Sequence, residues 1–403
     1  MIRYFNPGHE AAVWADSPFY QAPASVLKLQ EDLAFLPFWY AEPGDAVWIS
    51  RPLSSEFENL CKKRTVHPVL PRDLENKIDF LKNRPVDLWG ISKQSIHLFE
   101  KFSEQYQLSL GLPPWNNQYK EMSSRVFAAS CLSSMVNEIP GISPDLVPVF
   151  FTDLSEIERC NSNSPHKLLV KSPYSSSGRG LLWLEKPDLS RSSKQIIQGI
   201  LNRQKMVSVE KVVEKTLDFS MHFVSDEFVG YSLFYTSAKG AYEKTWLASQ
   251  EKIESKLTGY VSRELLSGVK QYLSGFIRSA ILPYYDGNVG VDMMIYQSGG
   301  NYCLHPCVEI NLRKSMGYLS LRLYQNHLHP ESEGFFSVVY DPKNEGVSKS
   351  CHCGLDPQSP ATRRKFRIKS GMTMSILTHP QIDLCPVYPD TKYRALLELS
   401  NGG

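Results

Sequence analysis

The stretch VGVDMMIYQSGGNYCLHPCVEINLR, residues 289–313, predicts a hairpin of two β-strands. Apolar residues dominate 289–296 and 302–312, and the two glycines at 299–300 have the composition of a tight turn. Two strands joined by so short a turn must be antiparallel neighbours in one sheet. The hairpin is therefore the point from which the rest of the fold can be placed.

Four polar side chains on this hairpin form the first candidate site. Glu309, Asn311 and Arg313 are spaced by two, so on a strand their side chains leave the same face. A two-residue turn at the glycines puts Asp292 opposite Cys307, on that same face. Carboxylate and amide oxygens suit Mg²⁺, which proteins hold with a few side chains plus substrate phosphates, and Arg313 can neutralise phosphate charge. The alternative is an amphipathic strand whose polar face meets water.

A second candidate site lies upstream, in the segment KSPYSSSGRG at 171–180. It connects two apolar stretches, 168–171 and 181–184, that we expect to be strands. Small residues let backbone N–H groups approach an anion, hydroxyls add donors, and a lysine at the end of a strand can reach phosphate oxygens. The Walker pattern and the protein-kinase signatures are absent from the sequence. An ordinary Ser/Gly hairpin loop is the alternative. The candidate phosphate contacts are Lys171, Ser175, Ser176, Ser177, Gly178 and Gly180.

A third element is VEKVVE at 209–214, followed by DFSMHF at 218–223. A strand that leads into a short linker offers backbone donors and acceptors to a planar base, and a carboxylate after it can hold ribose hydroxyls. Two ordinary core strands are the alternative. The candidate residues here are Glu210, Lys211, Val212, Val213 and Asp218.

Taken in order, these elements resemble the ATP-grasp superfamily over roughly residues 115–325. The resemblance implies a phosphate-covering hairpin at 171–180, an adenine-binding hinge at 209–213 and a ribose-binding acid at Asp218. It also implies a phosphate-binding cation at the start of the central helix, for which Lys120 and Arg125 are the candidates and Arg125 fits better. The metal-binding pattern of the ligase branch matches Asp292 and Glu309-x-Asn311.

The activity that this resemblance implies is that of an ATP-dependent, ADP-forming ligase. Two Mg²⁺ ions, or Mn²⁺ in their place, would bind Asp292, Glu309 and Asn311, and Lys171 would hold phosphate. A small-molecule or peptide carboxylate would form an acylphosphate, which an amine or another nucleophile attacks while Arg313 stabilises the developing charge. A phosphotransferase and a non-catalytic nucleotide-binding module are the alternatives.

The fold class expected is α/β plus α+β, with an open parallel α/β domain before a two-subdomain ATP-grasp fold. Short apolar runs at 2–5, 46–49 and 86–89 read as strands, and 93–106 reads as a helix. The expected parts are 1–114 (N-terminal α/β domain), 115–205 (central helices and first subdomain), 206–345 (second subdomain with the metal site), 349–374 (an insertion) and 375–403 (C-terminal segment).

Composition excludes several classes of protein. The 403 residues carry 44 Lys and Arg against 42 Asp and Glu, a balance that argues against a nucleic-acid partner. No apolar run approaches 18 residues, which argues against a membrane span and a signal peptide. Eight scattered cysteines are typical of reduced thiols in a cytoplasmic protein, and a homo-oligomer is compatible with all of this.

The segment 349–374 differs from the rest of the chain. It holds six basic residues and one acid, and its Cys-Gly-Leu-Asp-Pro-Gln-Ser-Pro stretch resembles the translated form of a dispersed bacterial genomic repeat. We expect a disordered insertion, with a basic surface loop as the alternative. The clusters Cys303/His305/Cys307 and Cys351-His352-Cys353 raise zinc binding, but alternation on a strand favours core thiols for the first.

Overall fold

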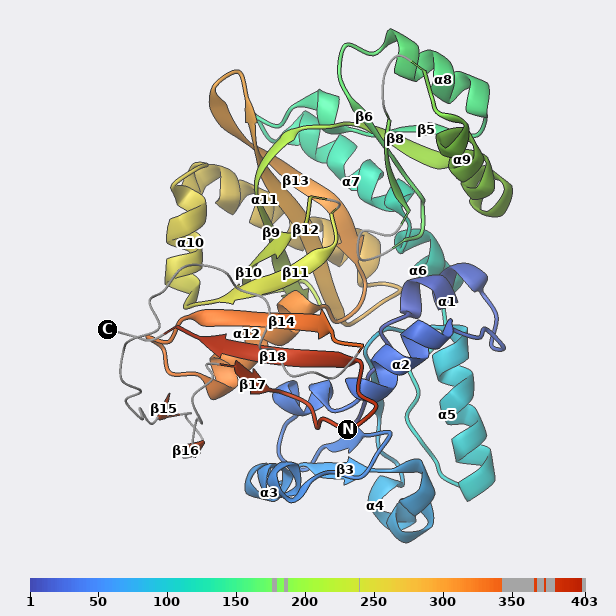
Figure 1. The fold of residues 1–403 in the computed structure, drawn as a ribbon, viewed down its shortest axis with the longest axis vertical. Helices are drawn as coiled ribbons and strands as arrows, with labels where there is room; N and C mark the ends of the chain where they lie inside the picture. The colour runs from blue at the N-terminus through green and yellow to red at the C-terminus, as the bar shows by residue number, and fades with distance from the viewer. Residues whose placement is uncertain are drawn as a thin grey trace.

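The computed structural model describes residues 1–175, 180–184, 188–238, 240–342, 366–367, 373–374 and 381–400. In this part of the chain a parallel sheet, a small antiparallel sheet and a large antiparallel sheet lie along the long axis of the molecule (Figure 1). This mixed architecture is the fold class that the sequence predicts.

The first layer is a parallel sheet in the order β3-β2-β1-β4. The helix expected at 93–106 is present with those bounds, because the Ser92 side chain accepts from the Ser95 N–H and caps it, while Ile96 and Phe99 are buried in the layer. The bounds are β1 (Ile2–Tyr4), β2 (Ala46–Trp48), β3 (His67–Val69), β4 (Val86–Leu88), α1 (His9–Ala15), α2 (Ala24–Asp32), η1 (Leu36–Tyr40), α3 (Ser55–Arg64), η2 (Pro71–Lys77), α4 (Ile78–Leu81) and α5 (Lys93–Tyr106).

The small antiparallel sheet has the order β5-β8-β6-β7. Its central hairpin pairs Leu168 with Leu184 and Lys171 with Leu181, so the segment 171–180 is the loop of a hairpin, as expected. Gly180 closes this loop with φ +73°, and a Cβ there would lie 2.7 Å from the Ser172 Oγ. The bounds are β5 (Val149–Phe151), α8 (Leu154–Asn163), β6 (Leu168–Lys171), β7 (Leu181–Leu184), α9 (Arg191–Gln204) and β8 (Val207–Lys211).

The large sheet has the order β13-β12-β9-β10-β11-β14-β18-β17. One core forms where α7, α10 and α11 pack against its first strands, and a second where α12 and η1 pack against its last strands. The bounds are α6 (Asn117–Met122), α7 (Arg125–Glu138), η3 (Pro144–Leu146), β9 (Glu214–Val224), β10 (Glu227–Thr236), β11 (Tyr242–Leu247), α10 (Gln250–Thr258), α11 (Arg263–Phe276), the π-helical η4 (Ile277–Ile281), β12 (Asn288–Ser298), β13 (Asn301–Asn311), α12 (Met316–His327), β14 (Gly334–Tyr340), β17 (Gln381–Asp383) and β18 (Tyr393–Leu399).

The C-terminal part contributes more than the sequence indicates. Strand β18 extends the large sheet by pairing with β14, a partnership between residues more than fifty positions apart, and β17 pairs with the other edge of β18. Of 349–374, the structure describes only the paired dipeptides β15 (Phe366–Arg367) and β16 (Thr373–Met374), so the expected disorder falls outside the described residues. The domain boundaries stay a prediction. Strand β8, placed after the 205/206 boundary, pairs with β5 and β6 of the small sheet.

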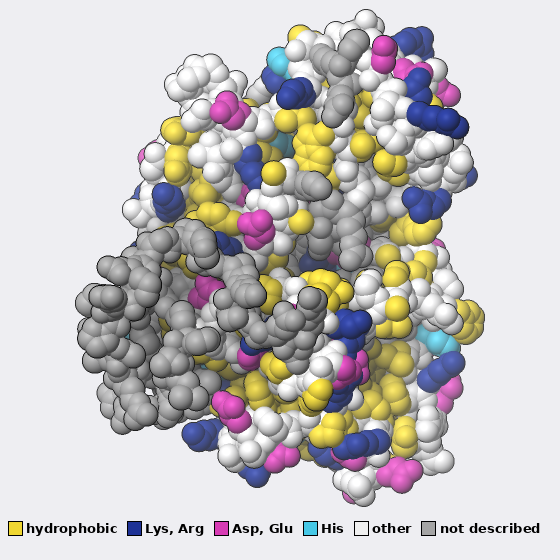
Figure 2. All heavy atoms as spheres, in the orientation of Figure 1, with side chains coloured by type: hydrophobic (Ala, Val, Ile, Leu, Met, Phe, Trp, Pro, Cys, Tyr) yellow, Lys and Arg dark blue, Asp and Glu magenta, His cyan; other side chains and the backbone are white. Residues whose placement is uncertain are grey.

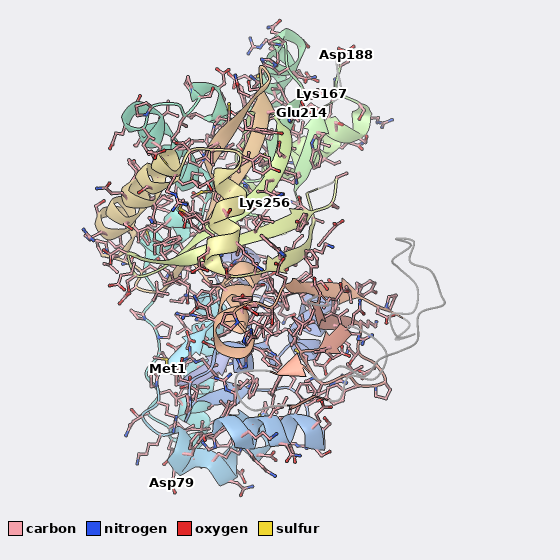
Figure 3. All side chains as sticks on the ribbon, turned by 90° about the vertical axis from the view of Figure 1, so that its left-hand side faces the viewer. Met1, Asp79, Lys167, Asp188, Glu214 and Lys256 are labelled. Carbon is pink, nitrogen blue, oxygen red and sulfur yellow. The ribbon has the colours of Figure 1, made fainter. Side chains whose placement is uncertain are left out.

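The small-sheet end of the molecule exposes both basic and hydrophobic side chains on the face shown in Figure 2. Lys and Arg side chains gather on the outer surface over α8 and α9, and hydrophobic side chains lie inward of them on the same face (Figure 2). In Figure 3, Asp188 lies at the small-sheet end of the molecule, and Asp79 lies at the opposite end, in the first layer. No helix in the part of the chain that the structure describes is both long and apolar enough to cross a bilayer.

Candidate functional site

A cavity of about 400 Å³ lies between the small sheet and the large sheet. Its walls come from β6 and β7 on one side and from β9, β10, β12 and β13 on the other, with the β8–β9 linker at one end. Nine of the residues predicted from the sequence line it: Arg125, Lys171, Glu210, Lys211, Val212, Val213, Asp218, Asp292 and Glu309.

The other predicted residues lie elsewhere. Asn311 and Ser175 sit just behind the lining, where the Asn311 Nδ2 is 3.0 Å from the Asp292 Oδ2 and the Ser175 Oγ is 3.4 Å from the Arg125 Nη2. Arg313 is turned toward the first layer. Gly180 closes the hairpin loop, and Ser176, Ser177 and Gly178 lie outside the described residues.

The two acidic side chains of the hairpin lie directly opposite one another. The turn is at 299–300 as expected, but Asp292 pairs with Glu309, so the expectation that it pairs with Cys307 is wrong. The register shifts because residues 306–308 face the single residue Met293, and Pro306 in this bulge has no N–H to give to the ladder. The bulge therefore brings the two carboxylates closer together than a regular ladder would.

Asp292 is held in place and is electrostatically strained. It accepts hydrogen bonds from the Ser220 Oγ at 2.6 Å and from the Asn311 Nδ2 at 3.0 Å. Burial, and then the neighbouring Glu309 carboxylate, raise the pKa of Asp292 to about 7. A cation placed against both carboxylates would remove this penalty, so the donor set fits a divalent ion. Among the described residues no group of three His, Cys, Asp or Glu side chains could hold a metal, so Asn311 and ligand oxygens would have to complete the coordination.

Two cationic side chains, Arg125 and Lys171, line the cavity together with the carboxylates. Arg125 donates from Nε to the Ser172 carbonyl at 3.1 Å and from Nη2 to the Glu309 Oε2 at 3.0 Å, so it bridges the two sheets. Its position follows from the cap of α7, where the Ser124 side chain accepts from the Phe127 N–H. Lys120, the other candidate, pairs with Asp16 at 3.5 Å and does not line the cavity.

Lys171 forms an ion pair with Glu210 inside the cavity. Burial alone would raise the pKa of Glu210, but Lys171, followed by Arg125, holds it below its usual value. The pair keeps a lysine ammonium fixed at the end of β6 in a largely enclosed space. A phosphate oxygen arriving here would meet two fixed cations, Lys171 and Arg125.

The linker end of the cavity combines the apolar side chains of Val212 and Val213 with the carboxylate of Asp218. The Val212 N–H donates to the Lys167 carbonyl at 2.9 Å, so this amide is already used inside the small sheet. Figure 3 labels Lys167, just before β6, and Glu214, the first residue of β9, toward the small-sheet end of the molecule. Further along β9, Asp218 accepts from the Thr236 Oγ1 at 2.8 Å and from the Lys215 Nζ at 2.6 Å.

Arg313, expected to act on the reacting charge, is tied to the first layer. Its Nε donates to Glu10, and its Nη1 donates to the Lys314 carbonyl at 3.1 Å. Burial alone would raise the pKa of Glu10, but Arg313 and then His9 hold it well below its usual value. Glu10 is thus a partner that sequence spacing could not assign, because it lies 303 positions from Arg313.

Sequence reasoning also missed residues of the cavity wall. Trp183 and Leu181 from β7 and Phe234 from β10 give it apolar surfaces, and His305 from β13 gives it a polar one. Apolar residues in strands are more often core, so nothing local separates Trp183 or Phe234 from an ordinary strand residue. His305 was visible in the sequence only as a candidate zinc ligand.

Comparisons with known proteins give similarities of structure only. No family model matches the chain, and no curated relative matches it. An N5-carboxyaminoimidazole synthetase from Staphylococcus aureus complexed with ADP matches with a TM-score of 0.41 at 12% identity, covering 84% of this chain and 82% of that one. A biotin carboxylase from Campylobacter jejuni matches with a TM-score of 0.47 at 9% identity, covering 93% and 85%. An L-amino acid ligase from Bacillus licheniformis matches with a TM-score of 0.44 at 12% identity, covering 100% and 93%. These similar structures are ATP-grasp enzymes, the superfamily whose motifs the sequence resembles.

Proposed function

We propose that the protein is an ATP- and Mg²⁺-dependent ligase that joins a carboxylate to an amine or another nucleophile through an acylphosphate. The observation that supports this most directly is the cavity itself. It collects two cations, Arg125 from the start of α7 and Lys171 from the small sheet, and two facing carboxylates, Asp292 and Glu309, from the large sheet. Such opposed sets of charge are what a nucleoside triphosphate with its metal requires.

The proposal gives each group of residues a task. Lys171 and Arg125 bind phosphate oxygens and hold the transferred group in line with its acceptor. Asp218 binds ribose hydroxyls, and the linker at Val212 and Val213 lies along the base. A phosphate would compete with Glu309 for Arg125, so nucleotide binding would also loosen the present bridge between the sheets.

Magnesium fits the remaining side chains. Asp292, Glu309 and the side-chain carbonyl oxygen of Asn311 would bind the ion. The ion would neutralise phosphate charge. The chain's own residues do the rest: the loop 171–180 covers the phosphates and excludes water, which would otherwise hydrolyse an acylphosphate. Arg313, held by Glu10, stands on the first-layer side of Asn311, where a carboxylate substrate would approach.

The test is ADP and phosphate release with panels of carboxylic acids and amines in the presence of ATP and Mg²⁺. We expect equal amounts of ADP and free phosphate, formed only when an acid is supplied and faster with the right amine. ADP without free phosphate would indicate a phosphotransferase instead, and nucleotide binding without turnover on any panel would indicate a non-catalytic module.

Variants of the carboxylate pair make the test specific to this site. Glu309→Gln is expected to lower ADP release by on the order of a hundredfold or more, because it removes a charged metal ligand. Glu227→Gln, on the exposed start of β10, is the matched control and should leave the rate unchanged. Equal rates for the two variants would contradict the assignment of the site.

A further inference from the structure

A groove along α11 has no task in the scheme above. It is open to solvent and encloses about 830 Å³, more than the cavity between the two sheets. Its lining comes from residues 138–140, at the end of α7, and from one side of α11, including Leu265, Gly268, Tyr272, Gly275 and Phe276. The groove is thus a solvent-facing hollow whose walls are largely apolar or small.

Two glycines inside a helix help to form this groove. Gly268 and Gly275 lie two turns apart on the same side of α11. A glycine in a helix interior destabilises the helix relative to alanine, and neither of these two has a positive φ that would require it. No described atom lies within 4 Å of the Cβ that either position would carry. Nothing within one copy of the described chain explains them, whereas a second backbone packed closely against α11 would.

The helix beside the groove exposes a surface without charge. Residues 126–137 of α7 contain no Lys, Arg, Asp or Glu. Several of them are nonetheless exposed, namely Val126, Ser130, Ser133 and Asn137. Depletion of charged residues distinguishes the centre of a protein interface from the remaining surface. The surface around the groove therefore has the composition of an interface.

Opposite charges lie at the two ends of α11 and its π-helical extension η4. Glu264 lies in the first turn and is exposed, and Arg263 beside it is already paired with Glu254 at 3.1 Å. Arg278 lies at the other end, where its Nε donates to Asp226 at 2.6 Å while its side chain stays 69% exposed. An antiparallel copy of the same helix would place each of these charged ends beside its opposite.

We propose that this groove binds α11 of a second copy of the chain, in an antiparallel pair related by a two-fold axis. An axis that sets Gly268 of one copy against Gly275 of the other lets the two backbones approach closely. The same axis brings Glu264 close to Arg278 twice, once at each end, because a two-fold interface repeats every contact. This inference does not depend on the proposed function.

The size of the face agrees with a dimer of modest affinity. The helical residues 263–281 extend for roughly 28 Å, and two adjacent helices are about 20 Å wide. Each copy would thus cover on the order of 500 Å² and the pair about 1,000 Å², which is near the lower limit for a specific interface. We therefore expect a dissociation constant in the micromolar range.

The experiment is sedimentation equilibrium of the full chain from about 1 to 100 µM, a range that brackets a micromolar dissociation constant. We expect a monomer–dimer equilibrium in the wild-type protein. Replacing both groove glycines, Gly268→Gln with Gly275→Gln, should raise the dissociation constant at least about tenfold, because bulk between the helices prevents close packing. The thermal unfolding midpoint should not fall, since glutamine favours a helix more than glycine does.

A glycine on another helix gives the matched control. Gly199 on α9 also has no described atom within 4 Å of a Cβ, so Gly199→Gln should dimerise as the wild-type protein does. A wild-type protein that stays monomeric throughout this range would overturn the inference and leave the groove to a different partner. A dimer that survives both groove substitutions, or that is lost equally in Gly199→Gln, would overturn it as well.

Charge reversal then tests the antiparallel arrangement. Glu264→Arg alone should weaken the dimer severalfold, because it places like charges together at both ends. Adding Arg278→Glu to the same chain should restore most of the affinity, and the thermal unfolding midpoint of each variant shows whether it is folded. A double variant that dimerises no better than Glu264→Arg would overturn the proposed pairing.

Discussion

At the scale of single residues, the site is defined by charges that the fold holds in an unfavourable state. Asp292 is buried beside Glu309, and the residues that flank each of them along its own strand are apolar. Such a buried carboxylate pair lowers the stability of the fold. Pairs of this kind are common where a ligand supplies the compensating charge. The carboxylate of Asp292 gives one prediction about stability, and the guanidinium of Arg125 gives one about nucleotide binding.

Asp292→Asn is expected to make the metal-free protein more stable at pH 8. The folded pKa of Asp292, about 7, lies above its unfolded value, so ionisation of this carboxyl lowers stability as pH rises between those two values. The amide of Asn does not ionise, so the variant does not lose this stability. Its thermal unfolding midpoint at pH 8 should be several degrees higher than that of the wild-type protein. The difference in unfolding midpoint between the variant and the wild-type protein should be smaller at pH 5. A variant less stable than wild type at pH 8 would contradict the electrostatic account.

Arg125→Ala is expected to weaken binding of the Mg²⁺–ATP complex at least tenfold, since charged hydrogen bonds to phosphate are stronger than neutral ones. Lys120→Ala is the matched control, because Lys120 lies five residues earlier, on α6, but pairs with Asp16. Calorimetry on both variants separates the two candidates. An equal loss in the two variants would mean that neither side chain contacts the nucleotide specifically.

At the scale of elements, local signals in the sequence are strong where a cap or a turn defines them. The Ser92 side chain caps α5 at the start predicted from the sequence, and Ser190 and Ser262 cap α9 and α11 in the same way, by accepting from the Ser193 and Leu265 N–H groups. The turn at 299–300 was also predicted. The bulge at Pro306 was not, because turn arithmetic assumes a regular ladder and only the folded sheet shows where the ladder breaks.

The pairing of β14 with β18 is the kind of feature that a local pattern cannot reveal, and it gives a prediction. Gly334 is the end of this ladder, where a Cβ would lie 2.0 Å from the Glu398 carbonyl oxygen. Gly334→Ala must therefore move the strand, and the free energy of unfolding should fall by at least about 2 kcal/mol. Gly199→Ala in α9, where nothing lies within 4 Å, should instead stabilise by up to about 1 kcal/mol. Urea unfolding of both variants checks the contrast, which fails if they change stability in the same direction.

At the scale of the whole molecule, buried histidines set the response to acid. Burial lowers the pKa of His222 to about 3 and the pKa values of His305 and His327 to about 4, against 6.5 when unfolded. The unfolded chain therefore binds more protons below pH 6.5, so stability falls as pH falls from there toward 4, by up to roughly 1.4 kcal/mol per histidine and pH unit. Asp292 works in the opposite direction throughout this window, because its folded pKa is about 7 and its unfolded pKa is 3.8, but one group opposes three.

We expect the unfolding midpoint to drop steeply between pH 6.5 and 4.5, and less steeply in His327→Gln. His166→Gln is the control, since His166 is exposed and its removal should not change the slope. A midpoint independent of pH across this window would contradict the assignment of these histidines as neutral core residues.

Deleting Lys349–Met374 is expected to leave thermal unfolding nearly unchanged. Tyr340 pairs with Tyr393 and Gln381 pairs with Glu398, so the described chain on either side of the segment stays within one sheet. Those two pairs lie five residues apart along β18, roughly 17 Å, and the fourteen residues left after the deletion (341–348 and 375–380) can span more than that. A large drop in the unfolding midpoint would mean that the segment belongs to the fold and is no insertion.

The end of β13 ties the molecule together in a way that bears on how the chain can be divided. Beyond Asn311 the chain crosses to the first layer, where Gly90 and Arg313 form a β-bridge and the Lys314 N–H donates to the Trp89 carbonyl at 2.9 Å. Lys314 also bonds to Asp87 and to the Leu88 carbonyl at the end of β4. A truncation that removes the first 114 residues would thus leave Arg313 and Lys314 without their acidic partners. It would also release one end of the segment that carries Glu309. The first layer is in this respect part of the scaffold that positions the candidate site, and we expect that shortening the chain from its beginning would disrupt this site rather than isolate it.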